Sequence, residues 1–461
     1  SAGTALLIPL TAKLPPTGAI IMLTAIFYGT QYGGTITSVL LNVPGEAASA
    51  ITCIDGHQMA KKGRGGAALS VAAVGSFIGG TIATVALICL AGPLTKVALE
   101  FGPVEFFALM VLGLSLLMGL AGKSMVKALM MGVVGLLLAM IGMDPVRGSP
   151  RFTFGRMELM DGLGFVPVIM GLFGLSEILE NAETTLKQDF HTKLDSLMPT
   201  KQEAKDSVGP IARGSLIGTV LGLVPGMTGS MASFLSYSME KKVSKHPEKF
   251  GTGAIEGVAG PETANNAQAN GALIPLFTLG IPSSPTVAVL MGAFLMNGLI
   301  PGPFLFKEQP ALVWGVIASF FIGNVILLVL NLPLIGVWVK MLKIPYSILF
   351  GLILTFMVVG AYGVENSAFD VFIMLLFGVL GYLLKKFDFP MAPLVLTLIL
   401  GPTMERSLRR SMEMSQGDFS ILFSSPLAIA MFALAAIVLI SSSLKFLPIK
   451  KLGGGGEDAE V

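Results

Sequence analysis

The residues best suited to hold a ligand are uncharged polar side chains beside two proline-containing breaks in otherwise apolar sequence. The first break is residues 42–45 (Asn-Val-Pro-Gly) and the second is residues 280–284 (Gly-Ile-Pro-Ser-Ser). Proline removes a backbone donor and clashes with the preceding turn, so each break frees backbone N–H and C=O groups. Freed N–H groups at a helix start attract anions, and freed carbonyls hold cations such as Na⁺. The pattern favours a site for a carboxylate and a coupling cation, although prolines in membrane helices also produce plain kinks.

A polar segment precedes each break. Residues 28–35 precede the first break, and residues 260–271 precede the second. Their amide and hydroxyl groups add neutral donors to the freed N–H groups, which suits a substrate that carries a carboxylate. The simpler interpretation is that Asn265 and Asn266 satisfy backbone groups in a helix-packing loop. We predict that the substrate is bound by Tyr32, Thr35, Asn42, Gly45, Asn265, Asn266, Ser283, Ser284 and Thr286.

Acidic residues near the breaks are candidates for binding the coupling cation, Na⁺ or H⁺. A charge at membrane depth is costly and is usually functional. The alternative is that Glu46 and Glu262 lie in wet loops or pair with Lys61 or Arg213. The candidates are the side chains of Glu46, Asp55 and Glu262, together with the freed backbone at Pro44 and Gly280.

Low charge content indicates a membrane protein. Of the 461 residues, 53% are hydrophobic and only 13% are Asp, Glu, Lys or Arg, whereas soluble proteins carry about 25%. The 30 Lys and Arg nearly balance the 28 Asp and Glu, so no general attraction to nucleic acid is expected. These figures exclude a disordered chain, a disulfide scaffold and an ordinary soluble enzyme.

Long charge-free runs predict the membrane-spanning helices. Residues 263–306 carry no charge over 44 positions, and one crossing needs about 20 residues. This run must therefore cross more than once, or cross with a break. We expect an all-α polytopic membrane fold with about a dozen transmembrane segments, several of them interrupted.

The two breaks belong to an internal repeat. When Pro44 is aligned with Pro282, short motifs match in the same order on both sides, such as Thr-Gly-Ala-Ile at 17–20 and 252–255. The repeat also predicts a further helix upstream of residue 1, ending in a Pro-Gly turn like that at 225–226. The expected divisions are a first membrane repeat (1–145), a connector with one apolar helix and a polar linker (146–208), a second membrane repeat (209–390) and C-terminal helices with a tail (391–461).

Loop charges predict that the two repeats run in opposite directions. Basic loops mark the cytoplasmic side, as at 61–64, 123–127 and 385–386, whereas Glu365 and Asp370 are expected outside. Opposite directions are the inverted-repeat plan of many secondary transporters. The side of residues 407–410 and of the C-terminus stays open. One loop disagrees with the pattern, because Arg147, Arg151 and Arg156 fall on the predicted outer side.

Several long motifs resemble the large membrane subunit of tripartite tricarboxylate transporters (TctA type), and the resemblance covers essentially the whole chain. They are residues 32–35, 41–46, 55–63, 250–258, 261–267 and 301–303. One departure stands at the second break, where that family usually has Ile-Pro-Gly-Ser and this chain has Ile-Pro-Ser-Ser at 281–284. A side chain at position 283 is expected to narrow the gap and to change which carboxylate fits.

The resemblance implies a multi-pass protein of the bacterial inner membrane, with no cofactor beyond a coupling cation. Its implied partners are a small four-helix membrane subunit, a periplasmic solute-binding protein that delivers a small carboxylate, and membrane lipid. An ion gradient of Na⁺ or H⁺ is expected to drive uptake. In the mechanism we expect, carboxylate and cation bind together between the two broken segments, and one element then moves against the other.

Two other classes of protein are alternatives. One is an ion-coupled carboxylate transporter or a channel that works without a binding protein. Its transport rate and its dependence on an ion gradient distinguish it from a transporter that needs a binding protein. A membrane-embedded enzyme needs clustered metal ligands, but the three histidines are scattered at His57, His191 and His246. Neither a phosphate-binding Lys loop nor a zinc motif is present in the sequence, so we expect no enzymatic activity.

Overall fold

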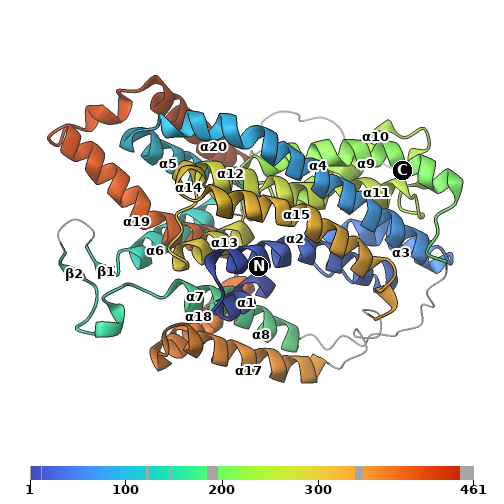
Figure 1. The fold of residues 1–461 in the computed structure, drawn as a ribbon, viewed down its shortest axis with the longest axis horizontal. Coiled ribbons are helices and arrows are strands. Elements are labelled where there is room, and N and C mark those ends of the chain that lie inside the picture. Colours follow the sequence, from blue (N-terminus) through green and yellow to red (C-terminus); the bar gives the residue numbers. More distant parts are fainter. Residues whose placement is uncertain are drawn as a thin grey trace, which may run out of the picture.

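Helices make up almost all of the described part of the chain, as expected from its apolar composition. The computed structural model describes residues 2–11, 13–120, 124–144, 148–183, 196–337 and 346–446 (Figure 1). The prediction of an all-α polytopic membrane fold is confirmed. The predictions that concern Lys123, Arg147, His191 and the tail after residue 446 lie outside the described residues.

The helices before the connector include one of 35 residues, α4, which lies beside α15 across the molecule (Figure 1). A short antiparallel pair, β1 (Gly142–Met143) and β2 (Pro150–Arg151), follows them. The helices are α1 (Ala2–Thr11), α2 (Pro16–Leu41), a 3₁₀ turn η1 (Ala47–Ala50), α3 (Thr52–Lys61), α4 (Gly65–Leu99), α5 (Pro103–Leu120) and α6 (Met125–Ala139).

The later helices continue from a 3₁₀ turn η2 (Met157–Leu159). They are α7 (Phe165–Ile169), the π-helical stretch η3 (Met170–Leu175), α8 (Ser176–Glu183), α9 (Lys201–Gly222), α10 (Gly229–Val243), the 3₁₀ turn η4 (Pro247–Lys249), α11 (Glu256–Gly271), α12 (Leu273–Leu279), α13 (Pro285–Met296), α14 (Pro303–Glu308), α15 (Pro310–Asn331), α17 (Tyr346–Glu365), α18 (Ala368–Lys386), α19 (Met391–Met414), the 3₁₀ turn η5 (Phe419–Phe423) and α20 (Pro426–Phe446).

Five helical stretches of the described chain are long and apolar enough to cross a membrane, by length and composition alone. They are Gly65–Leu99, Phe165–Glu183, Pro310–Asn331, Ala368–Lys386 and Pro426–Ser443. Shorter apolar helices, such as Pro285–Met296, accompany them. These criteria give fewer spans than the expected dozen because several other apolar helices of the described chain are shorter than one crossing.

Two helix pairs link the ends of the predicted repeats. α6 packs along α19, where a Cβ on Gly135 would lie 2.2 Å from the Leu394 carbonyl oxygen. η3 packs along α18, where a Cβ on Gly171 would lie 2.4 Å from the Met374 carbonyl oxygen. Because these two glycines have no side chain, both helix pairs approach closely. α6 belongs to the first predicted repeat, but α19 lies beyond the expected end of the second. α18 belongs to the second predicted repeat, but η3 lies in the predicted connector.

Charged residues at the helix ends are held by partners of opposite sign. Lys385 lies 3.0 Å from Glu180, and Lys386 lies 3.3 Å from Glu183. Two of the arginines that disagreed with the charge rule also have partners. Arg151 binds Glu405 through two hydrogen bonds of 2.8 and 3.2 Å, and Arg156 lies over the ring of Phe369. In the folded protein the Arg151 charge is therefore balanced by Glu405.

The last part of the predicted polar linker is helical. Residues 201–208 form the first turns of α9, and most of their side chains are exposed. Thr200 accepts a hydrogen bond from the Glu203 backbone N–H, and the Glu203 side chain accepts one from the Thr200 backbone N–H. This reciprocal capping box fixes the helix start at Lys201.

Candidate functional site

A polar helix, α11, lies at the centre of the described structure. Every residue from Gly257 to Gly271 is buried. Its buried side chains include one carboxylate, four amides and a hydroxyl between positions 262 and 270. Burying polar groups is costly unless they find hydrogen-bond partners, so a buried helix of this composition needs a specific function or a specific set of partners. The side chains are Glu262, Thr263, Asn265, Asn266, Gln268 and Asn270.

Glycines on two neighbouring helices let α11 fit closely between them. On α9, a Cβ at Gly218 would lie 2.2 Å from the Ala264 carbonyl oxygen. On α4, a Cβ at Gly79 would lie 2.6 Å from the Thr263 carbonyl oxygen. Such distances are far below van der Waals contact, so these positions exclude side chains. Gly214, Gly218 and Gly222, spaced one turn apart on α9, therefore serve close helix packing.

The two breaks follow the same backbone path. Asn42 ends α2 in the left-handed region (φ 57°, ψ 29°), and Gly280 ends α12 there as well (φ 70°, ψ 26°). Four residues later the chain is extended, at Glu46 (φ −150°, ψ 166°) and at Ser284 (φ −150°, ψ 165°). Paired residues are 238 positions apart in the chain, as in the alignment of Pro44 with Pro282. Each break therefore closes one helix and opens the next in the same geometry.

Glu262 connects α11 to the helices on both sides of the first break. Its carboxylate accepts a hydrogen bond of 2.7 Å from Thr35 Oγ1 on α2 and another from Thr52 Oγ1 on α3. The side chain is 1% exposed. Among the described residues no cation forms an ion pair with it. A buried carboxylate that only hydroxyl groups surround requires a proton or a bound cation to balance its charge.

Glu46 makes a second link between the first break and α11. Asn265 Nδ2 donates a hydrogen bond of 2.9 Å to Glu46 Oε1. The Gln31 amide, with its nitrogen turned toward the carboxylate, donates to the same oxygen at 2.8 Å. Glu46 also starts η1, where its backbone N–H donates to Ser49 Oγ. The alternative pairings with Lys61 and Arg213 are wrong, because Arg213 pairs with Glu240 and neither glutamate has a described basic partner.

The second break is held by a third turn, between α9 and α10. The backbone N–H of Gly226 donates 2.8 Å to the Ser283 carbonyl oxygen. Gln268 Nε2 on α11 donates 2.7 Å to the Met227 carbonyl oxygen in the same turn. Ser283 Oγ donates to the Ala272 carbonyl oxygen at 3.2 Å, and this side chain is fully buried. The hydroxyl therefore points to the end of α11 and is satisfied within the protein.

The remaining predicted residues are distributed around these contacts. Ser284 caps α13 by accepting from the Val287 backbone N–H at 3.3 Å, and Thr286 is half-buried in the first turn. Asn266 Nδ2 donates 2.7 Å to Ser76 Oγ on α4. Pro44 and Gly45 lie in the extended part of the first break, where Gly45 packs on Gly34.

Asp55 lies apart from this group. Its Oδ2 accepts from Tyr237 Oη at 2.8 Å, and its Oδ1 accepts from the backbone N–H groups of Gly251, Gly253 and Ala254 at 2.7–2.9 Å. The three backbone donors fasten the loop before α11 to α3, and Tyr237 adds a contact from α10. The structure thus gives Asp55 a clear anchoring contact, in contrast to Glu262, which has hydroxyl partners alone.

A cavity of about 10 Å³ lies beside the Glu262 group. It is lined by Tyr32, Thr35, Ser76 and Asn331 together with apolar side chains. The buried Tyr32 hydroxyl has no hydrogen-bond partner among the described atoms. This volume is about that of one water molecule or one bare ion. Four polar side chains therefore line part of a space of atomic size beside Thr35 and Ser76, both of which contact Glu262.

Sequence reasoning missed several members of the site, namely Gln31, Thr52, Ser76 and Gln268. Gln31 and Thr52 do stand in the segments around the first break, so proximity to Glu46 in the sequence was an available signal. Thr52 and Glu262 are 210 positions apart, however, and only the fold brings them together.

Comparison with known proteins gives a consistent result. The sequence model of the family described as "Tripartite tricarboxylate transporter TctA family" matches residues 1–396. An Agrobacterium vitis protein described as "Uncharacterized 52.8 kDa protein in TAR-I ttuC' 3'region" is 49% identical over 438 residues, which are 94% of this chain and 87% of that protein. A second one from Agrobacterium vitis, "Uncharacterized protein in TAR-II ttuC' 3'region", is 49% identical over 234 residues, 51% of this chain and 97% of that protein. No solved structure matches.

Proposed function

The chain belongs to the tripartite tricarboxylate transporter TctA family, and from this premise we propose that it is the large translocating subunit of a secondary transporter that imports small carboxylates. Membership in this family supports a role as a multi-pass membrane transport protein that works with partner subunits. In our proposal the partners are a small four-helix membrane subunit and a periplasmic solute-binding protein, and the complex lies in a bacterial inner membrane. Na⁺ or H⁺ drives uptake, and no other cofactor is involved.

The observation that carries the proposal is the buried carboxylate of Glu262. It lies between Thr35 and Thr52, and its side chain is almost completely inaccessible. Ionisable groups inside membrane proteins are expensive and mark ion or proton pathways. We assign the coupling cation to Glu262, with Glu46 as a second carboxylate near it. The small cavity lined by Tyr32, Thr35 and Ser76 offers space for one ion.

The substrate carboxylate fits the second break better than the first. The first break carries Glu46, which repels an anion, whereas the second carries Ser283, Ser284 and Thr286 and has no acidic side chain. The N-terminal end of α13 begins there and presents its partial positive charge. The Ser283 hydroxyl is occupied by the Ala272 carbonyl oxygen, so the hydroxyls of Ser284 and Thr286 and the helix end are the groups that suit a carboxylate. The two breaks thus divide the binding of cation and anion between them.

Uptake into proteoliposomes tests this proposal. The reconstituted chain, with its partner subunit and binding protein, is given labelled di- and tricarboxylates under an imposed Na⁺ or pH gradient. We expect saturable uptake that depends on one of the gradients and on the binding protein. Uptake that proceeds at full rate without either gradient would indicate a channel instead. Uptake without the binding protein would support the simpler type of carboxylate transporter.

A further inference from the structure

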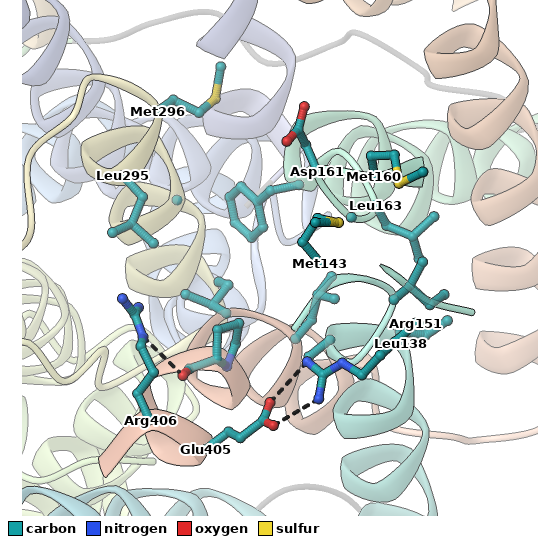
Figure 2. Close-up of a pocket in the computed structure, with 18 residues that line it drawn as sticks. Leu138, Met143, Arg151, Met160, Asp161, Leu163, Leu295, Met296, Glu405 and Arg406 are labelled. Atoms are coloured by element: carbon teal, nitrogen blue, oxygen red, sulfur yellow. Dashed lines mark hydrogen bonds and ion pairs between the residues drawn. The ribbon is translucent and has the colours of Figure 1, made fainter. Parts of the chain in front are cut away.

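A second cavity, of about 420 Å³, lies away from the breaks (Figure 2). Its walls come from the end of α6, described residues between positions 141 and 163, the start of α7, the end of α13 and the middle of α19. α13 begins at the second break and ends at this cavity, and its 12 residues separate the two by ~18 Å. The cavity is therefore separate from the second break, and it shares no lining residue with the small cavity beside Glu262. Its volume lies in the range of small-molecule binding pockets.

Two charged side chains of this cavity, Arg406 and Asp161, have no partner of opposite charge among the described residues. Arg151 and Glu405 neutralise each other through two hydrogen bonds, which Figure 2 shows as dashed lines. Arg406 uses its Nε to donate 3.2 Å to the Pro402 carbonyl oxygen, and its two terminal nitrogens have no described protein partner. Asp161 forms neither a described hydrogen bond nor a described ion pair. The two side chains lie on opposite sides of the cavity in Figure 2.

The rest of the wall is apolar and adaptable. Met143, Met160 and Met296 contribute flexible side chains, which adjust to ligands of different shape. Phe165 packs on Gly292, where a Cβ would lie 1.4 Å from the Phe165 ring, so the wall between α7 and α13 is closely fitted. A guanidinium presents two parallel donors that match a carboxylate, and a carboxylate such as Asp161 accepts a hydrogen bond from a hydroxyl.

The position of the cavity agrees with the predicted outer side. The loop that forms one wall carries Arg156, whose guanidinium lies 5.7 Å from the Phe369 ring centre. Phe369 is next to Asp370, which loop charges place outside. Arg409, one turn from Glu405, pairs with Asp144 of the same loop at 3.1 Å. Substrate would therefore meet this cavity before it reaches the second break.

We propose that this cavity is a vestibule that binds a small hydroxycarboxylate before transport, with a substrate carboxylate on Arg406 and a substrate hydroxyl donating to Asp161. The proposal rests on the proposed function, since it assumes that carboxylates pass through the chain. It adds a fixed positive charge that the breaks do not provide. It also predicts a preference for hydroxylated acids over acids of equal charge that lack the hydroxyl.

Protection of an engineered cysteine tests the vestibule without relying on uptake. In the complex in membrane vesicles, with Cys53 and Cys89 replaced by Ala, Met296→Cys is labelled by a membrane-impermeant maleimide. We expect malate to slow this labelling, with succinate needing about tenfold higher concentration for the same protection. Ile300→Cys, exposed and outside the cavity, reports normal insertion and should be labelled equally with and without malate.

Paired arginine variants complete the experiment. Arg406→Gln should abolish protection by malate, whereas Arg410→Gln, exposed one turn further along α19 and outside the cavity, should retain it. Asp161→Asn should remove the difference between malate and succinate. The vestibule is ruled out if malate gives no protection, or if protection persists in Arg406→Gln. If protection follows the expected pattern while no carboxylate is taken up, the vestibule stands and the transport function fails.

Discussion

The first and second breaks share one backbone path but carry opposite chemistry. Asn42 and Gly280 both turn the chain through the left-handed region, and Glu46 and Ser284 then open the next helix in the same extended conformation. At the first break two carboxylates gather around amides and hydroxyls. At the second break hydroxyls and a third turn satisfy the backbone. A repeated scaffold thus positions both breaks, while the side chains at each break decide which ion that break attracts.

The largest effect is expected from removing the negative charge of Glu262, the buried carboxylate that is contacted from both sides of the first break. Glu262→Gln keeps the size of the side chain and its contacts with Thr35 and Thr52 but removes the group that balances a cation. We expect gradient-driven uptake to fall by about 100-fold, the loss typical of a hydrogen-bonded charge. Initial uptake rates measure this. Glu248→Gln, at an exposed position, is the control and should transport normally. If Glu262→Gln couples uptake to the gradient as well as the wild type does, the cation does not bind at the first break.

Exchanging the small residues of the two breaks tests their steric difference. A Cβ at Gly45 would lie 2.6 Å from the Gly34 Cα, so Gly45→Ser should destabilise the protein by about 2 kcal/mol through overpacking. At the matched position, Ser283→Gly loses only the hydrogen bond to Ala272 and should cost about 1 kcal/mol. Thermal unfolding in detergent compares the two. Equal destabilisation would show that the breaks tolerate side chains alike.

The link between Glu46 and α11 should contribute less than Glu262. Asn265→Ala removes one of the two described amide donors to Glu46, and Gln31 remains. We expect the apparent affinity for the coupling cation to change by about tenfold while the maximal rate is largely retained. Uptake as a function of cation concentration measures the shift. An unchanged cation dependence, in a variant that inserts normally, would argue that Glu46 plays no part in coupling.

The smallest effect is expected at the cap of α13. Ser284→Ala removes the oxygen that accepts from the Val287 N–H and should lower stability by about 1 kcal/mol. Ser284→Asp restores an acceptor but adds a negative charge where we place the substrate. We expect it to recover stability and to weaken carboxylate uptake. If Ser284→Asp transports as well as wild type, the substrate does not bind at the second break.

Much of the fold followed from local pattern. Charge-free runs predicted the helices, and Pro44 and Pro282 located both breaks because a proline effect is confined to its own turn. The division into repeats is untested, and the pairing of α6 with α19 and of η3 with α18 favours one more helix in each half than residues 1–145 and 209–390 contain. Which distant helices pack against each other has no local signal in the sequence.

The site was predicted as a neighbourhood but not as a set of contacts. Position relative to the breaks identified Thr35, Glu46, Glu262 and Asn265, and the structure brings them together. The same reasoning grouped Asp55 with them, although its four donors come from Tyr237 and the loop at 251–254. A carboxylate looks the same in the sequence whether backbone N–H groups or hydroxyls surround it. Nothing in the sequence indicated that Asp161 and Arg406 line one cavity, because they lie 245 positions apart.

The glycine faces that enclose α11 have a consequence for synthesis. The face of α4 at Gly75, Gly79 and Gly80 is made about 180 residues before Glu262 leaves the ribosome, which takes ~10–40 s at cellular elongation rates. During that interval the hydroxyls of Thr35 and Thr52 and the narrow groove of α4 have no native occupant. The first half must therefore wait in the membrane, protected by the insertion machinery or by another helix, until the second half supplies the polar core.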